Sequence, residues 1–364
     1  MKSLSFLICL FGISFLLVGC NGKSKNQEGK FEVVKIKGSE YTIANLSDFV
    51  ENPEMIKLET NDTCLISGIT HLEVTTKYVF ISDRANLFQF DRKGKFIRKI
   101  GRQGHGPHEH QGILCFTVSS NDERIFIGTL GKIFCFDFNG GFIEEIVDYK
   151  LFDCIYACND ELWAFFTEIA KSNDGKFENR TKVNQYSLKG GILKNSILLK
   201  SIKHDAQEVN LVRNIQYVSE TSTQRYIYTP VYFEPISRDT LYRIKDSLLI
   251  PDIKLDFSDL AVINGKAKNI QIVNINRNER YLFAEYVYKG KSRLFIYDFL
   301  NSNQYNLTEE FNDNVFGTGN AMLRPVDSKF DLMYFKKEGY ELVGKVEGVT
   351  ENSNPVVFIV ELKK

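Results

Sequence analysis

Short runs of apolar residues alternate with polar positions along most of the chain after residue 30. The runs are rich in phenylalanine, isoleucine and valine, which favour strands because aromatic and β-branched side chains pack well on a pleated surface. Only Leu46 to Val50 offers a short helix candidate. The pattern therefore predicts an all-β chain.

Two stretches of this pattern are copies of one another. Residues 78–101 align without a gap on residues 124–147, and nine of the 24 aligned positions are identical. Each copy carries an Asp followed three residues later by a Gly, which fits a type I turn between two strands. Three strands per copy, with a fourth before or after, make a four-stranded meander. A period near 46 is typical of a propeller blade.

Weaker copies occur later in the chain, at residues 161–193, 238–257, 280–299 and 340–362. The first of these carries an insertion from Glu168 to Arg180. An early strand is expected at 31–36, and Pro355 to Leu362 is a strand without a following partner. In a closed ring the first strand can complete the last blade and remove the free sheet edges. We predict one domain over 31–364, a six-bladed β-propeller of four-stranded antiparallel blades.

The first thirty residues indicate export. Lys2 precedes an apolar stretch from Leu4 to Val18, which is shorter than the about 20 residues of a spanning helix. The stretch ends in Leu17-Val18-Gly19-Cys20, which resembles a bacterial lipoprotein signal. We therefore expect a signal peptide at 1–19, lipid on Cys20 and a flexible polar tether over 20–30. An ordinary secretory signal or an uncleaved anchor is the alternative.

Three segments are similar to a known family. Residues 56–72, 90–107 and 230–244 resemble the six-bladed β-propeller lipoproteins of Bacteroidales, which are relatives of TolB-like and NHL-type propellers. The resemblance implies the fold more than any chemistry. It departs from the family at 106–110, where Gly-Pro-His-Glu-His stands in place of Gly-Pro-Gly-Glu-Tyr.

The same resemblance implies an address and a modification. An acidic run after the lipidated Cys is associated with surface display in Bacteroidetes-type lipoproteins, and none follows Cys20. An outer-membrane location facing the periplasm is therefore favoured over the cell surface. Asp239-Thr240-Leu241 and Asp246-Ser247-Leu248 resemble O-glycosylation acceptors, which makes Thr240 and Ser247 candidate sites, although chance in a turn-rich segment explains them equally well.

Composition narrows the function classes. The 46 basic and 46 acidic residues give no net charge, which argues against a nucleic-acid partner. Seven Cys in 364 residues do not make a disulfide-dense scaffold. Cys154 and Cys158 would be about 13 Å apart in an extended strand, too far for a disulfide, although a turn could bring them together.

Candidate binding residues concentrate in the loop from Gly101 to Gly112, which holds three of the five His. Three interpretations stay open: a ligand-contacting loop, a metal site, or a tight turn between blades. We predict no bound metal and no cofactor. The candidate ligand-binding residues are Asp83, Arg102, His105, His108, Glu109 and His110.

Catalytic sequence motifs are missing, including G-x-S-x-G and H-E-x-x-H. The favoured function is a membrane-anchored, non-catalytic binding or scaffold module for a glycan, a peptide or an envelope protein. The alternative is a propeller-type polysaccharide hydrolase or lyase, supported by Glu109 and, more weakly, by Asp83. Such an enzyme should bring two carboxylates or His within about 5–10 Å of each other in the channel.

Overall fold

The computed structural model describes residues 31–36, 41–171, 174–204, 217–230, 238–245, 247–258 and 270–364. The chain divides into two units, Met1–Lys30 and Phe31–Lys364, and every described residue belongs to the second. The predicted signal peptide, the tether and Cys20 therefore lie outside the described residues.

Three sheets of the described chain have four strands each. The first contains β3 (His71–Val74), β4 (Tyr78–Ser82), β5 (Leu87–Asp91) and β6 (Phe96–Ile100). The second contains β20 (Ile270–Arg277), β21 (Tyr281–Tyr288), β22 (Lys291–Asp298) and β23 (Asn303–Thr308). The third contains β26 (Arg324–Pro325), β27 (Leu332–Lys337), β28 (Val356–Leu362) and β2 (Val50–Lys57).

Two sheets are larger. One has five strands, in the order β1 (Glu32–Lys35), β19 (Leu248–Asp256), β18 (Thr240–Lys245), β17 (Arg225–Ile227) and β16 (Val218–Glu220). The other has seven: β9 (Cys115–Ser119), β10 (Arg124–Gly128), β11 (Leu130–Asp137), β12 (Phe142–Cys158), β13 (Glu161–Lys171), β14 (Phe177–Ser187) and β15 (Leu193–His204).

The remaining elements are short. Two strand pairs stand apart, β7 (Arg102–Gln103) with β8 (Glu109–His110) and β24 (Phe311–Asp313) with β25 (Gly319–Ala321). The short helix expected after residue 45 is present as η1 (Leu46–Asp48), and a second helix, α1 (Gly339–Leu342), was not expected. No helix of the described residues is long and apolar enough to cross a membrane.

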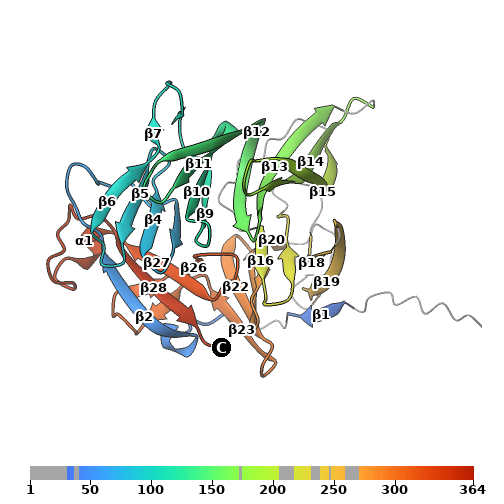
Figure 1. Cartoon of the computed structure of the whole chain (residues 1–364). Coiled ribbons are helices and arrows are strands. Elements are labelled where there is room, and N and C mark those ends of the chain that lie inside the picture. The colour runs from blue at the N-terminus through green and yellow to red at the C-terminus, as the bar shows by residue number, and fades with distance from the viewer. Residues whose placement is uncertain are drawn as a thin grey trace, which may run out of the picture. The chain divides into compact units, whose positions relative to one another are not determined.

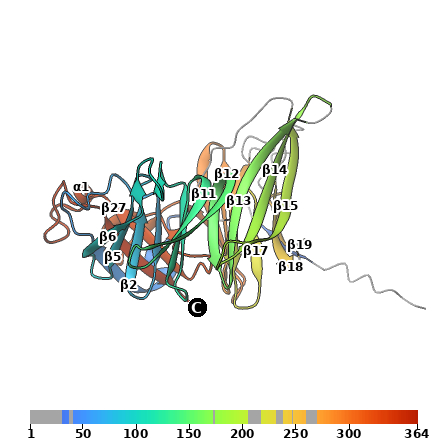
Figure 2. The ribbon, with the colours of Figure 1, turned by 45° about the horizontal axis from the view of Figure 1, so that its top comes forward.

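The sheets of the Phe31–Lys364 unit follow one another in a propeller-like ring (Figures 1 and 2). The all-β class is thus confirmed, but six separate four-stranded blades are not what the described chain forms. β12 runs through 17 residues and pairs with β11 over its first part and with β13 over its second, with an irregularity at Tyr149, whose φ is 30°. It contains no Gly or Pro to end the strand, so two arrays become one sheet.

Closure of the ring also differs from the expectation. The strand that completes the last sheet is β2, which pairs antiparallel with β28, and not the strand at 31–36. That earlier strand, β1, instead adds to β19 in parallel, so this sheet is mixed rather than antiparallel. The predicted principle holds, because the free edge of β28 is covered by an early strand.

The sequence repeat corresponds to a structural repeat. Asp91 accepts hydrogen bonds from the backbone N–H groups of Lys93 and Lys95, both at 2.9 Å. Asp137 does the same in the second copy, with the N–H groups of Asn139 and Gly141 at 2.8 Å. The glycine three residues after each Asp has a φ near 80°, the left-handed conformation that a side chain disfavours.

The hydrophobic core lies between neighbouring sheets. Phe80 of the first sheet packs in one cluster with Phe116 and Phe134 of the seven-stranded sheet, and all three are buried. The strands nearest the ring axis are called the inner strands here: β3, β9, the second part of β12, β16, β20 and β26. Neighbouring inner strands contact one another, as β3 and β9 do.

Candidate functional site

The His-rich loop predicted from the sequence is held together by its own side chains. Glu109 accepts a hydrogen bond from the Gly106 N–H through Oε2 at 2.8 Å, and its Oε1 lies 3.4 Å from Arg102 Nε. The Gly104 N–H donates to the His110 carbonyl at 3.0 Å. These contacts connect β7 with β8 and shape a compact turn.

The three His of this loop have three different surroundings. His105 Nδ1 lies 3.0 Å from Gln111 Nε2, and the His108 ring stacks on Phe142 with centroids 3.7 Å apart. His110 is buried, which lowers the pKa of its imidazole. No group of three or more His, Cys, Asp or Glu suited to a metal ion occurs among the described residues. The loop's role in binding stays a prediction.

The other predicted site residues lie elsewhere. Asp83 is buried and caps a turn, where its Oδ1 accepts the N–H groups of Ala85 at 3.1 Å and Asn86 at 2.7 Å. Thr240 donates through Oγ1 to Asp239 at 3.0 Å, and the Ser247 hydroxyl accepts from Asn195 Nδ2 at 2.6 Å. Glycosylation of Thr240 and Ser247 stays a prediction.

Cys154 and Cys158 are free thiols on the continuous strand β12. The extended interpretation of their spacing is therefore confirmed. Burial raises the pKa of both thiols, in the case of Cys158 to about 12. Neither thiol is an activated nucleophile.

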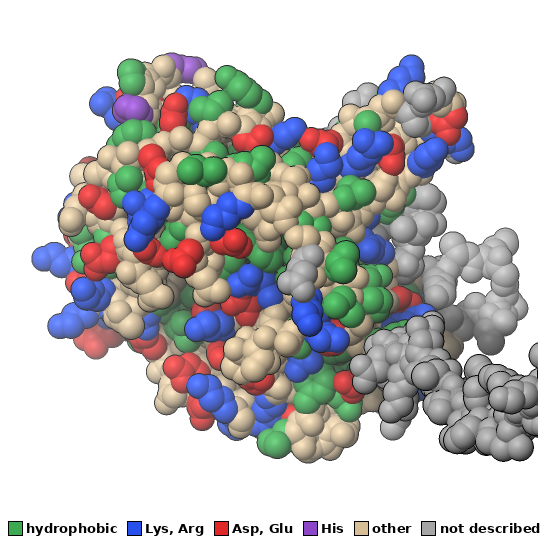
Figure 3. Space-filling model, turned by 45° about the vertical axis from the view of Figure 1, so that its right-hand side comes forward, with side chains coloured by type: hydrophobic (Ala, Val, Ile, Leu, Met, Phe, Trp, Pro, Cys, Tyr) green, Lys and Arg blue, Asp and Glu red, His purple; other side chains and the backbone are tan. Residues whose placement is uncertain are grey.

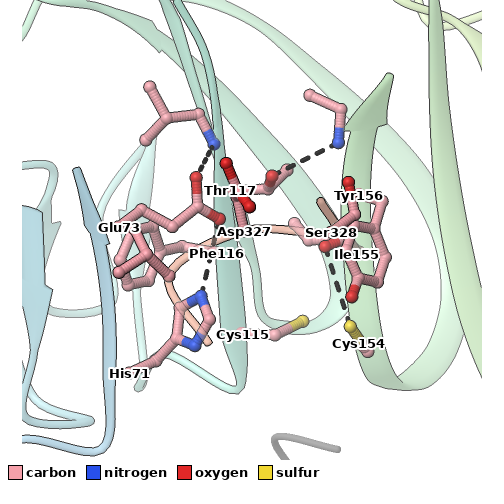
Figure 4. Close-up of a pocket in the computed structure, with 13 residues that line it drawn as sticks. His71, Glu73, Cys115, Phe116, Thr117, Cys154, Ile155, Tyr156, Asp327 and Ser328 are labelled. Carbon is pink, nitrogen blue, oxygen red and sulfur yellow. Dashed lines mark hydrogen bonds and ion pairs between the residues drawn. The ribbon is translucent and has the colours of Figure 1, made fainter. Parts of the chain in front are cut away.

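A small cavity of about 70 Å³ lies between the inner strands β3, β9 and β12 and the segment after β26. Figure 4 shows His71, Glu73 and Asp327 on its walls. His71 Nε2 is 3.5 Å from Glu73 Oε1, and Glu73 Oε2 accepts the Val118 N–H at 2.8 Å. The His71 ring also packs edge-on against the Phe116 ring of β9, with centroids 4.7 Å apart.

Asp327 is the most perturbed carboxyl of the small cavity. Asp327 lines the cavity, and its side chain is in contact with solvent there. The Lys329 N–H donates a hydrogen bond to its Oδ1 at 2.9 Å. Burial, with a contribution from the charge of Glu73, raises its pKa to about 6. The carboxyl therefore titrates near neutrality.

A large cavity of about 580 Å³ adjoins the small one, and His71 lines both. Its walls come from sheets far apart in the sequence. The polar lining residues are Thr70, His71, Asn274, Asn276, Glu285, Glu310, Asn320, Arg324, Lys336 and Lys337. Apolar and aromatic groups, among them Met322, Phe330 and Tyr334, complete the walls. This volume lies within the about 300–1,000 Å³ of ordinary ligand pockets.

Each cation of the large cavity is paired with a carboxylate of the protein, while Glu310 accepts a hydrogen bond from the Asn320 amide. Arg324 lies between two carboxylates, 3.6 Å from Glu285 and 3.1 Å from Glu309. Lys336 pairs with Glu338 at 2.7 Å, and Lys337 with Glu341 at 3.4 Å. Burial raises the pKa of Glu285, an effect that Arg324 opposes and Glu309 reinforces.

Sequence reasoning missed this cavity. Its one local signal is in β20, where Asn274 and Asn276 alternate with apolar residues and are buried. Such buried polar positions on an inner strand point toward a site, because apolar residues would otherwise be expected there. The other lining residues come from strands whose proximity no local pattern reveals.

Figure 3 shows a different surface of the Phe31–Lys364 unit, with histidines at one upper edge and a charged projection at the other. The hairpin β13–β14 extends beyond the neighbouring strands through the segment expected as an insertion. Ion pairs cover it: Glu168 binds Lys150 at 2.6 Å and Lys182 at 2.7 Å. Ion-paired charges of this kind are typical of a solvent-exposed surface.

The comparison with protein families gives one match over most of the chain. A family model described as a domain of unknown function (DUF4934) matches residues 31–361. The chain belongs to this family. No curated protein matches it.

One solved structure with a TM-score above 0.5 is similar in fold. A crystal structure from Bacteroides fragilis NCTC 9343, described as an exported protein, is 18% identical, with a TM-score of 0.62. The alignment covers 91% of this chain and all of the other. The Pan2 WD40 domain of Neurospora crassa is 10% identical, with coverages of 81% and 76% and a TM-score of 0.42. The extracellular domain of a one-component system of B. thetaiotaomicron is 14% identical, with coverages of 71% and 29% and a TM-score of 0.39.

Proposed function

We propose that this member of the DUF4934 family is a non-catalytic binding module of the cell envelope that holds a neutral glycan in the large cavity. The observation that carries the proposal is the cavity of about 580 Å³ bordered by the inner strands β3, β20 and β26 and by neighbouring strands, whose walls combine amides, carboxylates and aromatic rings. A rigid scaffold of sheets keeps such groups in fixed positions.

The pairing of the charges favours a neutral ligand. Arg324 is already neutralised by Glu285 and Glu309, and the two lysines of the lining have their own glutamates. A strongly anionic ligand would have to break these pairs and leave a partner charge uncompensated, which is costly in a partly enclosed space. A polyhydroxyl ligand needs no such exchange.

The remaining groups suit hydroxyls and the apolar faces of sugar rings. Asn320 and Glu310 border the cavity and are joined by a hydrogen bond from Asn320 Nδ2 to Glu310 Oε2 at 2.7 Å. Amides donate and accept, and carboxylates accept, which matches hydroxyl groups that do both. Tyr334 and Phe330 supply apolar surface.

Location belongs to the same proposal. Leu17-Val18-Gly19-Cys20 and the polar residues after it support a lipid anchor at Cys20 in the outer membrane, facing the periplasm. Export is supported by the similar fold of the Bacteroides fragilis exported protein. It is also supported by the resemblance to TolB-like and NHL-type lipoprotein propellers. Palmitate labelling of the full chain should be lost in Cys20→Ser; labelling that persists would exclude the anchor.

The experiment for the ligand is a glycan array probed with the full chain in detergent. We expect binding to neutral oligosaccharides, and weaker binding of Asn320→Ala, because that substitution removes an exposed amide of the large cavity. Gln111→Ala in the His-rich loop is the matched control and should bind as the parent does. Exclusive binding of sulfated or uronic glycans, or loss of binding only in Gln111→Ala, would contradict the proposal.

The rival function, a polysaccharide hydrolase or lyase, has one supporting observation. His71, Glu73 and Asp327 meet in the small cavity beside the large one, and the pKa of Asp327 is raised to about 6. A carboxyl that titrates near neutrality suits a general acid. Release of reducing ends from a bound polysaccharide, abolished in Asp327→Asn, would establish this function; its absence with bound glycan supports the binding module.

A further inference from the structure

A third cavity opens beside the large one and is called the apolar recess here. It measures about 40 Å³ and lies in the core between the β20–β23 sheet and the sheet that β2 completes. Its apolar walls are formed by Phe49, Phe283, Leu294, Ile296, Phe311 and Leu323 among others. The recess and the large cavity share five lining residues, namely Asn276, Glu285, Arg324, Pro325 and Phe330.

The size of the recess limits what it can hold. On the same measure, one water-sized group occupies about 10–15 Å³, so the recess has room for two or three groups the size of a methyl. A sugar ring or a phenyl ring does not fit. The shared residues place an amide, a carboxyl and a guanidinium at the boundary between apolar recess and polar cavity.

We propose that the apolar recess takes the acetamido methyl of an N-acetylated sugar bound in the large cavity. This inference rests on the proposed glycan-binding function and narrows the ligand to N-acetylhexosamine glycans. An acetamido group combines a methyl, an N–H donor and a carbonyl acceptor. Glu285 can accept the N–H, and Asn276 and Arg324 carry donors for the carbonyl.

A packing gap without function is the competing explanation. The distinction lies in the boundary, because a gap enclosed in the core would be lined by apolar groups throughout. Here Glu285 reaches both spaces, and its pKa is raised by burial. The half-buried Glu285 carboxyl has Arg324 as a partner, and the acetamido N–H would be a second one.

The decisive experiment compares two disaccharides on the full chain in detergent by titration calorimetry. Diacetylchitobiose and cellobiose share the β-1,4 linkage. Diacetylchitobiose carries an acetamido group on each sugar ring where cellobiose carries a hydroxyl group. We expect diacetylchitobiose to bind at least about tenfold more tightly, the range for one well-placed group in a pocket. Equal affinities would overturn this inference and leave the proposed function intact. Failure of every neutral glycan to bind would overturn both.

Two substitutions that fill the recess test its location. Leu323→Phe and Leu294→Phe should each remove the preference for diacetylchitobiose while changing the affinity for cellobiose less than about twofold. Leu300→Phe, at a leucine that is 72% exposed on another surface, is the control and should keep the preference. If either recess variant folds and retains the full preference, the recess is only a packing gap. If neither variant folds, the affinities of the parent protein for the two disaccharides still test the inference.

Discussion

The His-rich loop and the large cavity are two polar regions with opposite organisation. In the loop, polar groups satisfy one another over short sequence distances, as Glu109 does with Gly106 and Arg102. In the large cavity, groups from distant strands surround an open volume, as Arg324, Glu285 and Asn276 do. A concentration of chemically versatile residues in the sequence is therefore a weaker sign of a site than polar groups brought to the same enclosed space.

Removing an arginine should destabilise the protein more in the large cavity than in the His-rich loop. Arg324→Ala leaves Glu285 and Glu309 without their shared cation, which should lower the free energy of unfolding by about 1–3 kcal/mol. It should also weaken glycan binding. Arg102→Ala removes a side chain that is 84% exposed and should cost less than about 0.5 kcal/mol. Urea unfolding of both variants checks this order, and similar losses would refute the distinction.

The pH dependence of stability tests the small cavity next. The folded-state pKa of Asp327 is raised to about 6, so the folded chain binds this proton more tightly than the unfolded chain. Stability should therefore fall as pH rises from about 4 to 6, and Asp327→Asn should remove that fall. With screening by water in the cavity, we expect the variant to gain about 1 kcal/mol at pH 7.

Unfolding curves at pH 4 and pH 7 provide the measurement for Asp327. The gain should vanish at pH 4, where the parent carboxyl is protonated in the folded state. A gain of equal size at both values would mean that packing, rather than ionisation, explains it.

The smallest effect is expected in the loop. Burial lowers the pKa of His110, so the folded chain favours the neutral ring and loses stability as pH falls below the unfolded value of about 6.5. Because the loop is short and mostly exposed, the loss should be below about 1 kcal/mol and local. Hydrogen exchange of the Gly104 amide should rise as pH falls from 7 to 5, relative to its intrinsic rate. His110→Phe should abolish that pH dependence without altering glycan binding.

The sequence predicted what depends on local repetition. The Asp91 and Asp137 turns could be found because an Asp, a Gly and flanking aromatic residues recur at fixed spacing. The continuity of β12 could not, since nothing between Ile146 and Leu151 states whether a strand ends or continues. The large cavity was missed for a related reason: Glu285 and Arg324 lie on strands of two different sheets, and no local pattern shows that packing of these sheets makes them neighbours.

The pairing of β2 with β28 has a consequence for how the molecule is made. One edge of the final sheet is supplied early in synthesis and the other at its end, with some 300 residues between Val50–Lys57 and Val356–Leu362. Until β28 has been synthesised, β2 cannot form this pairing, and the ring stays open. A nascent chain that stalls shortly before Val356 would therefore present an adhesive strand to its neighbours, which makes a holding chaperone valuable at that late moment.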